Sequence, residues 1–334
     1  MGSVSPTCPL LRDNVSEHIG ETPLRCAKLE YFNAGGSVKD RIAKRMVEQA
    51  ERDGIIRSGD TLIEASSGNT GIAIALMAAV KRYKCIIILS EKMSMEKEQI
   101  LCMLGTRVVR TPAGVPIESP DSIISVAKCL QKEIPNSYVL DRYGNPENLA
   151  AHEFGTAEET LYQTSNKVDV VVAGAGAGGT ITGLSRGLKK YDPNIILVGV
   201  DPLGSVLAVP ETLNQSKAEY KVEGIDYDFV PGVLGQNSAD FWIKTTDKDA
   251  FNYARQLVRE EGMLVGGSSG SAIAGLVRLL ALRPELNTEG KTIVLIFPDS
   301  LRNYLTKFAD DEWMKTHGFL ELTEKGVGKL EGSK

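Results

Sequence analysis

The chain has 334 residues, of which 42% are hydrophobic and 24% are charged. These fractions are typical of a soluble globular protein with a large core, and they argue against a disordered or fibrous chain. At about 150 residues per domain, the length favours two folding units. The net charge of −5 argues against nucleic acid as a partner, because a duplex-binding domain usually carries a basic face.

Cysteine and histidine usage indicates a cytoplasmic protein with reduced thiols and no metal centre. The five cysteines form no Cys-x-x-Cys pair and the three histidines lie far apart, so neither a disulfide framework nor a zinc site is predicted. The N-terminus lacks the apolar core of a signal peptide. The longest apolar run, Gly71 to Val80, is much shorter than the ~20 residues that span a bilayer, so we expect no membrane association.

The first segment with a chemical signature is a helix expected to begin near residue 38. Leu29–Phe32 resembles the end of a strand, and Asn33–Gly36 a loop. Ser37 is a good N-cap, with Asp40 three residues later. Lys39 then lies in the first turn, where the helix dipole disfavours its charge and should lower its pKa. An easily deprotonated amine there suits a Schiff-base lysine, whereas a solvent-screened surface lysine is the alternative.

Short apolar runs then alternate with helical patterns, which is typical of βαβ units in a doubly wound α/β fold. Continuous apolar runs predict parallel strands covered on both faces. The expected strands are Thr61–Ala65, Cys85–Leu89, Arg107–Thr111, Tyr138–Asp141, Val168–Ala173, Ile195–Asp201 and Thr292–Phe297. The expected helices between them include Ile72–Val80, Glu96–Leu104, Thr182–Lys190, Asp249–Glu261 and Ala272–Leu282.

Three glycine-rich loops follow apolar runs and open helices: Ser66–Gly71, Gly174–Thr180 and Gly266–Ser271. Each offers free backbone N–H groups and the positive end of a helix dipole to an anion. Ligands of such sheets bind beyond the carboxyl ends of the strands, so we expect one ligand carrying a phosphate and a carboxylate. Glycines that serve only tight turns are the alternative for any single loop.

A dinucleotide site is a competing hypothesis. Gly174, Gly176 and Gly179 have the spacing of a nucleotide-binding fingerprint, and Asp201 ends the next strand. The motif is not in the first βα unit, however, and it explains neither Lys39 nor the first glycine loop. A binding protein that has lost its catalytic chemistry is a second competing class.

Four motifs in order resemble the fold-type II pyridoxal-phosphate enzymes, in the cysteine synthase/cystathionine β-synthase family. They are Asn33–Arg41, Glu64–Gly71, Gly176–Thr180 and Gly267–Ser268. Three later segments favour the cystathionine-forming branch: Glu223–Phe229, Pro298–Tyr304 and Lys307–Met314. The resemblance implies a tryptophan synthase β-like fold of two doubly wound parallel-sheet subdomains. The catalytic module would span residues 18–319, with a smaller subdomain at about 61–141 and a tail at 320–334.

The resemblance also implies site residues for pyridoxal 5′-phosphate. Lys39 would form the Schiff base and act as the catalytic base. Asn69 would bind the ring hydroxyl, Ser268 the ring nitrogen, and Gly176, Ala177, Gly178, Gly179 and Thr180 the phosphate. Ser66, Ser67 and Thr70 would hold the substrate carboxylate, and Tyr143 and Tyr227 would line or cover the pocket, with core packing as their alternative.

The implied reaction is a β-replacement on serine with homocysteine that gives cystathionine, in cysteine biosynthesis by transsulfuration. Cysteine synthase, which combines O-acetylserine and sulfide, is the alternative, and a pseudoenzyme that binds pyridoxal phosphate is another. The resemblance implies a lyase that works as a homodimer on small amino acids.

The chain departs from the family pattern at three places. A strand and loop that the family has between Leu24 and Arg25 are missing. Asp226 stands where the family has a glycine, so we expect either backbone strain or repulsion of the substrate carboxylate. Ala177 replaces a threonine and removes one hydroxyl donor. We also expect no haem segment and no C-terminal regulatory domain pair.

Overall fold

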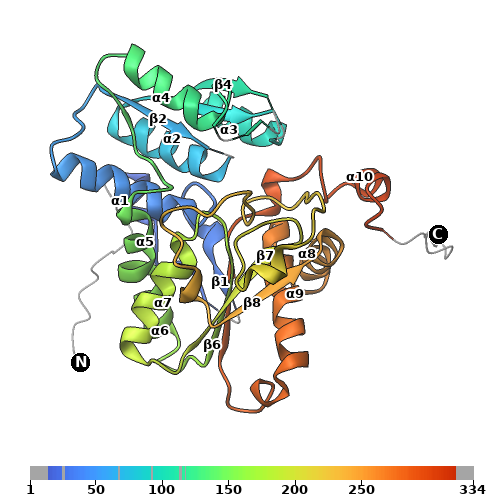
Figure 1. Ribbon diagram of the computed structural model, residues 1–334. Helices are drawn as coiled ribbons and strands as arrows, with labels where there is room; N and C mark the ends of the chain where they lie inside the picture. The colour runs from blue at the N-terminus through green and yellow to red at the C-terminus, as the bar shows by residue number, and fades with distance from the viewer. Residues whose placement is uncertain are drawn as a thin grey trace, which may run out of the picture.

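The computed structural model describes residues 14–24, 27–66, 68–91, 93–112, 115–116 and 118–320. Two parallel sheets, each with helices on both faces, lie one above the other in Figure 1, which confirms the expected α/β class. No helix within these ranges is long and apolar enough to cross a membrane.

The larger sheet has the strand order β1-β9-β6-β7-β8, all parallel. Its strands are β1 (Ala27–Leu29), β6 (Val170–Gly174), β7 (Ile196–Pro202), β8 (Phe241–Thr245) and β9 (Ile293–Phe297). Side chains alternate between the two faces, so Val170 and Val172 pack in one core with Phe251. Val171 lies in the other core, against Leu184. Both faces of the larger sheet are therefore buried, which explains why its strands read as continuous apolar runs in the sequence.

The smaller sheet has the order β4-β3-β2-β5, again all parallel. Its strands are β2 (Thr61–Ala65), β3 (Lys84–Ser90), β4 (Arg107–Thr111) and β5 (Ser137–Val139). Leu62 and Ile87 face a core that includes Met46, whereas Ile63 and Ile88 face Ala127.

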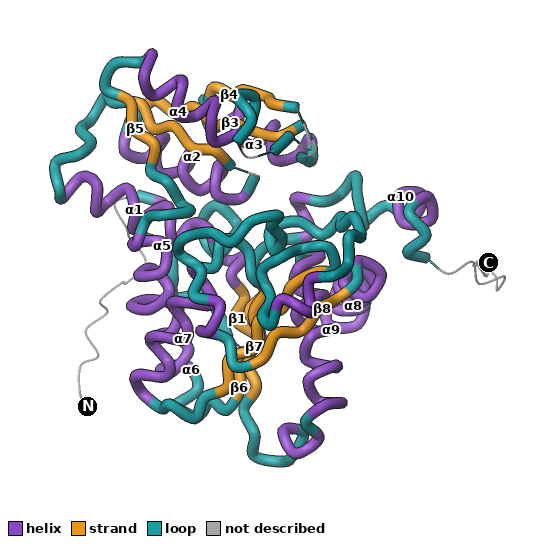
Figure 2. The backbone as a smooth tube through the Cα atoms, viewed as in Figure 1, coloured by secondary structure: helices purple, strands orange, loops and turns teal. Residues whose placement is uncertain are grey.

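Helices flank both sheets, and several begin where a strand has just ended. They are α1 (Lys39–Arg52), α2 (Asn69–Lys81), α3 (Met95–Met103), α4 (Ile123–Glu133), α5 (Pro146–Ala151), α6 (Ala157–Gln163), α7 (Gly179–Tyr191), α8 (Asp247–Glu261), α9 (Gly267–Leu282) and α10 (Asp311–Thr316). A π-helical segment, His152–Thr156, joins α5 to α6. Figure 1 shows α6 and α7 on one side of the larger sheet and α8 and α9 on the other. Figure 2 shows the long loops between β7 and β8 lying between the two sheets.

The seven expected strands correspond to β2–β7 and β9, and the five expected helices to α2, α3, α7, α8 and α9. The expected strand end at Leu29–Phe32 is partly wrong, because β1 ends at Leu29 and Glu30–Phe32 forms a 3-10 helix. The strand β8 and the helices α4, α5, α6 and α10 were not predicted from the pattern. The expected cap of the first helix needs a correction. The N-cap is Val38, not Ser37, although the Ser37 hydroxyl accepts the Lys39 N–H (3.2 Å) and the Asp40 carboxylate accepts the Gly35 N–H (2.7 Å).

Candidate active site

One cavity of about 240 Å³ lies at the carboxyl ends of the strands, between the two sheets. The first turns of α1, α2, α7 and α9 all contribute to its wall, so four helix N-termini meet at one place. Their unpaired N–H groups and dipoles make the cavity favourable for anions. Of the residues proposed from sequence, eleven line it: Lys39, Asn69, Thr70, Tyr143, Gly176, Ala177, Gly178, Gly179, Thr180, Tyr227 and Ser268.

Lys39 is the first residue of α1, as the sequence predicted, and its side chain reaches the cavity. The pKa of its amine is lowered from 10.5 to about 8, first by burial and then by the positive charge of Arg142. The negative charge of Asp299 acts in the opposite direction. The amine is therefore much easier to deprotonate than an exposed lysine, and burial is the largest cause.

The loop that opens α7 forms a row of backbone donors. The N–H groups from Gly176 to Thr180 donate to no acceptor among the described residues, whereas the neighbouring Ala175 N–H bonds to Val200. Gly178 makes this turn possible because its φ of 96° is rarely adopted by other residues. Five free donors at a helix N-terminus suit a phosphate.

The first turns of α2 and α9 complete the wall opposite α7. Asn69 is held at both ends of its amide, since Nδ2 donates to Asp299 Oδ2 (2.7 Å) and Oδ1 accepts from Asn303 Nδ2 (3.1 Å). Its side chain also lines the cavity. The Ser268 side chain is buried at the start of α9 and lines the cavity with a neutral hydroxyl.

The loop before α2 divides the three residues proposed for the substrate carboxylate. Thr70 lines the cavity and accepts a hydrogen bond from Arg142 Nη1 (3.0 Å). Ser66 does not line it, because its hydroxyl accepts the N–H groups of Gly71 (2.7 Å) and Gly68 (3.2 Å) and so shapes the loop. Ser67 lies outside the described residues.

Aromatic side chains close one end of the cavity. Tyr143 packs edge-on against Tyr227 and Phe229, with ring centroids 5.6 and 5.4 Å away. The Tyr227 hydroxyl donates to the Tyr143 hydroxyl at 3.5 Å. Both tyrosines therefore line the pocket and also pack against each other.

Asp226 belongs to this cavity wall as well, which decides between the two expectations for this position. Its backbone is not among those with positive φ, so the change from glycine causes no strain there. The carboxylate forms a hydrogen bond with the Tyr220 hydroxyl, and burial together with Asp226 raises the pKa of Tyr220. Its negative charge thus lies at the end of the cavity where the tyrosines gather.

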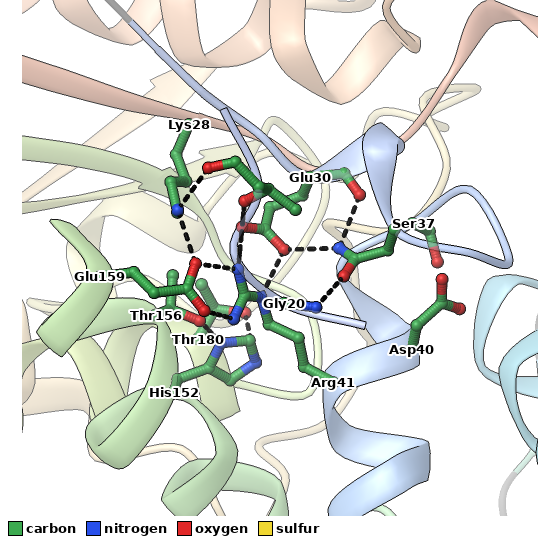
Figure 3. Close-up of polar contacts among 12 residues, drawn as sticks. Gly20, Lys28, Glu30, Ser37, Asp40, Arg41, His152, Thr156, Glu159 and Thr180 are labelled. Atoms are coloured by element: carbon green, nitrogen blue, oxygen red, sulfur yellow. Dashed lines mark hydrogen bonds and ion pairs between the residues drawn. The ribbon is translucent and has the colours of Figure 1, made fainter. Parts of the chain in front are cut away.

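His152 contacts Thr180, the last residue of the glycine loop that opens α7. Its Nε2 lies 3.2 Å from Thr180 Oγ1, and its Nδ1 lies 2.9 Å from Thr156 Oγ1 (Figure 3). Burial lowers the pKa of the imidazole well below 6.5, so the ring is neutral. If Thr156 donates to Nδ1, Nε2–H donates to Thr180 and leaves the Thr180 hydroxyl hydrogen free for a phosphate. The π-helical segment supplies the ring and Thr156, whereas Thr180 comes from the first turn of α7.

A buried ion network fixes the start of α1 (Figure 3). Arg41 donates to Glu30 (Nε–Oε2, 2.6 Å) and to Glu159 (Nη1–Oε1, 2.6 Å), and Lys28 also donates to Glu159 (2.6 Å). Burial by itself would raise the pKa of Glu159, but hydrogen bonds from Arg41 and Lys28 lower it to about 2. Because Arg41 follows Lys39 by two residues, the network anchors the turn that carries the lysine.

Further polar groups at the cavity come from elements to which the sequence analysis assigned no role. Lys97 of α3 pairs with Glu223 (2.5 Å) and thereby connects the two sheets across the cavity. Asp299 follows β9, accepts a hydrogen bond from Tyr304, and has its Oδ1 buried without a partner. Arg142 follows β5. The position of Asp299 in a quoted motif and that of Arg142 beside Tyr143 were the only signals available in the sequence.

The residues present fit pyridoxal phosphate. Five unpaired N–H groups suit its phosphate, and a neutral hydroxyl from Ser268 suits a ring nitrogen that is not held protonated. The Lys39 amine, with a pKa of about 8, suits covalent attachment of an aldehyde.

Comparison of the chain with known proteins also indicates pyridoxal phosphate as the cofactor. The family model described as pyridoxal-phosphate dependent enzyme matches residues 5–299. The chain is 51% identical to a cystathionine beta-synthase of Dictyostelium discoideum over 97% of this chain and 67% of that protein. It is 51% identical to a cystathionine beta-synthase of Oryctolagus cuniculus over 96% of this chain and 60% of that protein, so it spans about three fifths to two thirds of these relatives. The crystal structure of an O-acetylserine dependent cystathionine beta-synthase from Helicobacter pylori matches with a TM-score of 0.80 and 35% identity, over 89% of this chain and 98% of that one.

Proposed function

The chain belongs to the family of pyridoxal-phosphate-dependent enzymes, and we propose that it replaces the β-hydroxyl of serine with the thiol sulfur of homocysteine, giving cystathionine and water. The observation that carries the proposal is that Lys39 and the five free N–H groups before α7 line the same cavity. When bound, pyridoxal phosphate withdraws electrons from Cα of an amino acid, which allows loss of the α-proton and of a group on Cβ.

In this proposal the chain holds the cofactor at four points. The N–H groups of Gly176, Ala177, Gly178, Gly179 and Thr180 bind the phosphate, and the Thr180 hydroxyl adds a donor that His152 orients. Asn69 donates to the ring hydroxyl, and Ser268 bonds the ring nitrogen. A serine hydroxyl, unlike a carboxylate, does not keep that nitrogen protonated, which favours elimination at Cβ over transamination. Lys39 binds the aldehyde carbon.

Lys39 is also the proton carrier of the proposal. Its amine lies in the cavity that would hold the amino acid, where it would accept the α-proton when it is free and neutral. A pKa of about 8 keeps a usable fraction of the amine neutral near pH 7 while leaving the ammonium acidic enough to return a proton. The two tyrosines, Tyr143 and Tyr227, cover the reacting atoms and limit access of water.

The experiment has two parts. Borohydride reduction of the holoenzyme, followed by digestion and mass spectrometry, should find the cofactor's mass on the peptide that contains Lys39, and a Lys39→Ala variant should lack it. Purified protein should then form cystathionine from serine and homocysteine. An unmodified Lys39 peptide in a protein that carries the cofactor would contradict the proposed role of this residue.

Cysteine synthase is the second candidate, because the name of the matching Helicobacter pylori structure includes O-acetylserine. The same protein is therefore assayed with O-acetylserine plus sulfide. A higher kcat/KM for this pair than for serine plus homocysteine favours the second candidate. Cofactor attachment without turnover of either pair favours a pseudoenzyme.

We also propose that the protein works as a homodimer in the cytoplasm. Support comes from the family resemblance and from four aromatic side chains that are exposed in the single chain, Phe32 (58%), Phe154 (50%), Tyr162 (85%) and Tyr191 (54%). Light scattering of the purified protein tests the dimer, and fractionation of the source cells tests the location.

A further inference from the structure

Asp226 is a carboxylate of the cavity wall to which the proposed function gives no role. Of the other carboxylates that the described residues place in this wall, Glu223 forms ion pairs with two lysines, both at 2.5 Å. Asp299 accepts hydrogen bonds from within the site, and Asp228 is exposed to solvent. Asp226, in contrast, is half-buried and forms a hydrogen bond with a neutral group, the Tyr220 hydroxyl. It therefore brings negative charge to a cavity whose helix N-termini favour anions.

The backbone on both sides of Asp226 is anchored. Ile225 is 2% exposed and packs in the core of the larger sheet. The Tyr227 N–H donates to Ser205 Oγ, and Ser205 Oγ donates to the Tyr227 carbonyl, each at 3.1 Å. The carboxylate is therefore presented to the cavity from a fixed position. Because a carboxylate has about four acceptor sites, it can accept hydrogens from a ligand as well as the one from Tyr220.

Asp226 acts at the aromatic end of the cavity and not at the reacting amine. The charged side chains that shift the pKa of Lys39 do not include Asp226 among the described residues. Burial is the main cause of the raised pKa values of Tyr220 and Tyr227, and the Asp226 charge adds to both. A ligand group that reaches Asp226 therefore lies away from the carbon that exchanges its substituent. The second substrate has such a group, because in homocysteine two methylene groups separate the sulfur from the carbon that carries the ammonium.

We propose that Asp226 binds the ammonium group of the second substrate, so that the site prefers thiols that carry an amine to thiols that carry only a carboxylate. The inference rests on the proposed function in taking the second substrate to be a thiol. Hydrogen bonds between an ammonium and a carboxylate are about twice as strong as those between neutral groups. A carboxylate at the same position would be repelled. A glycine, which the family has here, supplies neither effect.

The kinetic test compares two thiols of similar length on the holoenzyme, with serine as the first substrate and, in parallel, with O-acetylserine. One is 3-(dimethylamino)propane-1-thiol, whose tertiary amine cannot condense with the cofactor aldehyde, and the other is 4-sulfanylbutanoate. Mass spectrometry measures the thioether product. We expect kcat/KM to be higher for the amine by about tenfold or more. Asp226→Asn should bring the two thiols within a few fold, and Asp226→Glu should recover part of the preference. Glu289→Gln, which removes an exposed carboxylate, should behave as the wild type does.

A binding measurement tests the same inference without turnover. Titration calorimetry on the holoenzyme gives the Kd of the S-methyl derivative of the same amine and that of 3-(methylsulfanyl)propan-1-ol, an uncharged compound of similar length. Neither compound has a thiol, so neither is consumed. The wild type should bind the cation about tenfold more tightly than the alcohol, and Asp226→Asn should lose most of this difference.

The outcomes separate the inference from the proposed function. If the wild type forms cystathionine but Asp226→Asn keeps the preference for the amine, the role of Asp226 is wrong and the proposed function stands. If Asp226→Asn loses the preference of the wild type for the cation, yet the wild type forms no cystathionine, the ammonium site stands and the proposed reaction is wrong. A wild type that binds the cation and the alcohol equally overturns the inference even if no variant folds.

Discussion

The reactivity of Lys39 before the cofactor binds is a direct consequence of the structure. In the cofactor-free protein, burial and the charge of Arg142 together lower the pKa of the amine from 10.5 to about 8. At pH 7 an amine with a pKa of 8 is about 9% neutral, whereas one with a pKa of 10.5 is about 0.03% neutral. The neutral, nucleophilic fraction of Lys39 at pH 7 is therefore about 300 times larger than that of an amine with the unshifted value, so Lys39 should react faster with an aldehyde.

The assay is the pH dependence of modification in the apoenzyme. A limiting amount of an amine-selective reagent is added at pH values from 6 to 11, and peptide masses give the rate at Lys39 and at the exposed Lys132. The Lys39 rate should rise with pH and reach half its maximum near pH 8. Asp299→Asn removes the one negative group that raises the Lys39 pKa and should move this midpoint down, whereas Arg142→Gln should move it up.

Few charged groups other than Arg142 and Asp299 can alter the pKa of Lys39. Arg142 and Asp299 act on it directly, and His152, the nearby imidazole, is neutral because burial lowers its pKa. A Lys39 midpoint near 10.5, or identical midpoints in the wild type and both variants, would refute the reasoning.

Three other expectations concern the surroundings of the lysine and the phosphate loop. Glu159→Gln removes the carboxylate that binds Arg41 and should lower the free energy of unfolding by about 3 kcal/mol at pH 7. Since the Glu159 pKa is about 2 in the folded chain and 4.5 otherwise, urea titrations should show the full difference above pH ~4.5 and a shrinking one towards pH 2. His152→Phe should weaken pyridoxal phosphate binding about tenfold in equilibrium dialysis, because Thr180 loses its orienting partner; an unchanged Kd would contradict the tautomer argument. Gly179→Ala would put a Cβ 1.9 Å from a side-chain oxygen of α5, so thermal unfolding should show a clear loss of stability together with loss of the phosphate site.

Strands buried on both faces were the easiest part of the fold to predict, because most of the residues in them are apolar. The strand β8 was not predicted because Lys244 interrupts its apolar run. The ammonium of Lys244 is satisfied by Asp201 at 2.7 Å, a partner on the neighbouring strand that only the folded sheet supplies. β1 has three residues, too few for a periodic pattern. The helices α5 and α6 were not predicted because the π-helical segment between them interrupts the 3.6-residue period of apolar side chains.

The candidate site was predictable only where one short motif supplies several groups. The glycine loop before α7 and the start of α1 are of this kind, and the structure places both at the cavity. Arg142, His152 and Asp299 are single polar residues whose importance depends on neighbours far away in the chain. Apart from the motif that contains Asp299 and the position of Arg142 beside Tyr143, nothing in their local sequence separates them from surface residues.

The cause assigned to the low pKa of Lys39 also changes between sequence and structure, and the magnitudes explain why. The field at a helix N-terminus contributes about 0.3–1 kcal/mol, whereas a fall in pKa from 10.5 to about 8 corresponds to about 3 kcal/mol. The dipole of α1 is therefore too weak to be the main cause, and burial followed by Arg142 accounts for the shift. Arg142 therefore enlarges the neutral fraction of the Lys39 amine, but less than burial does. Loss of the Arg142 charge should raise the Lys39 pKa only part of the way back towards 10.5, because the amine remains buried.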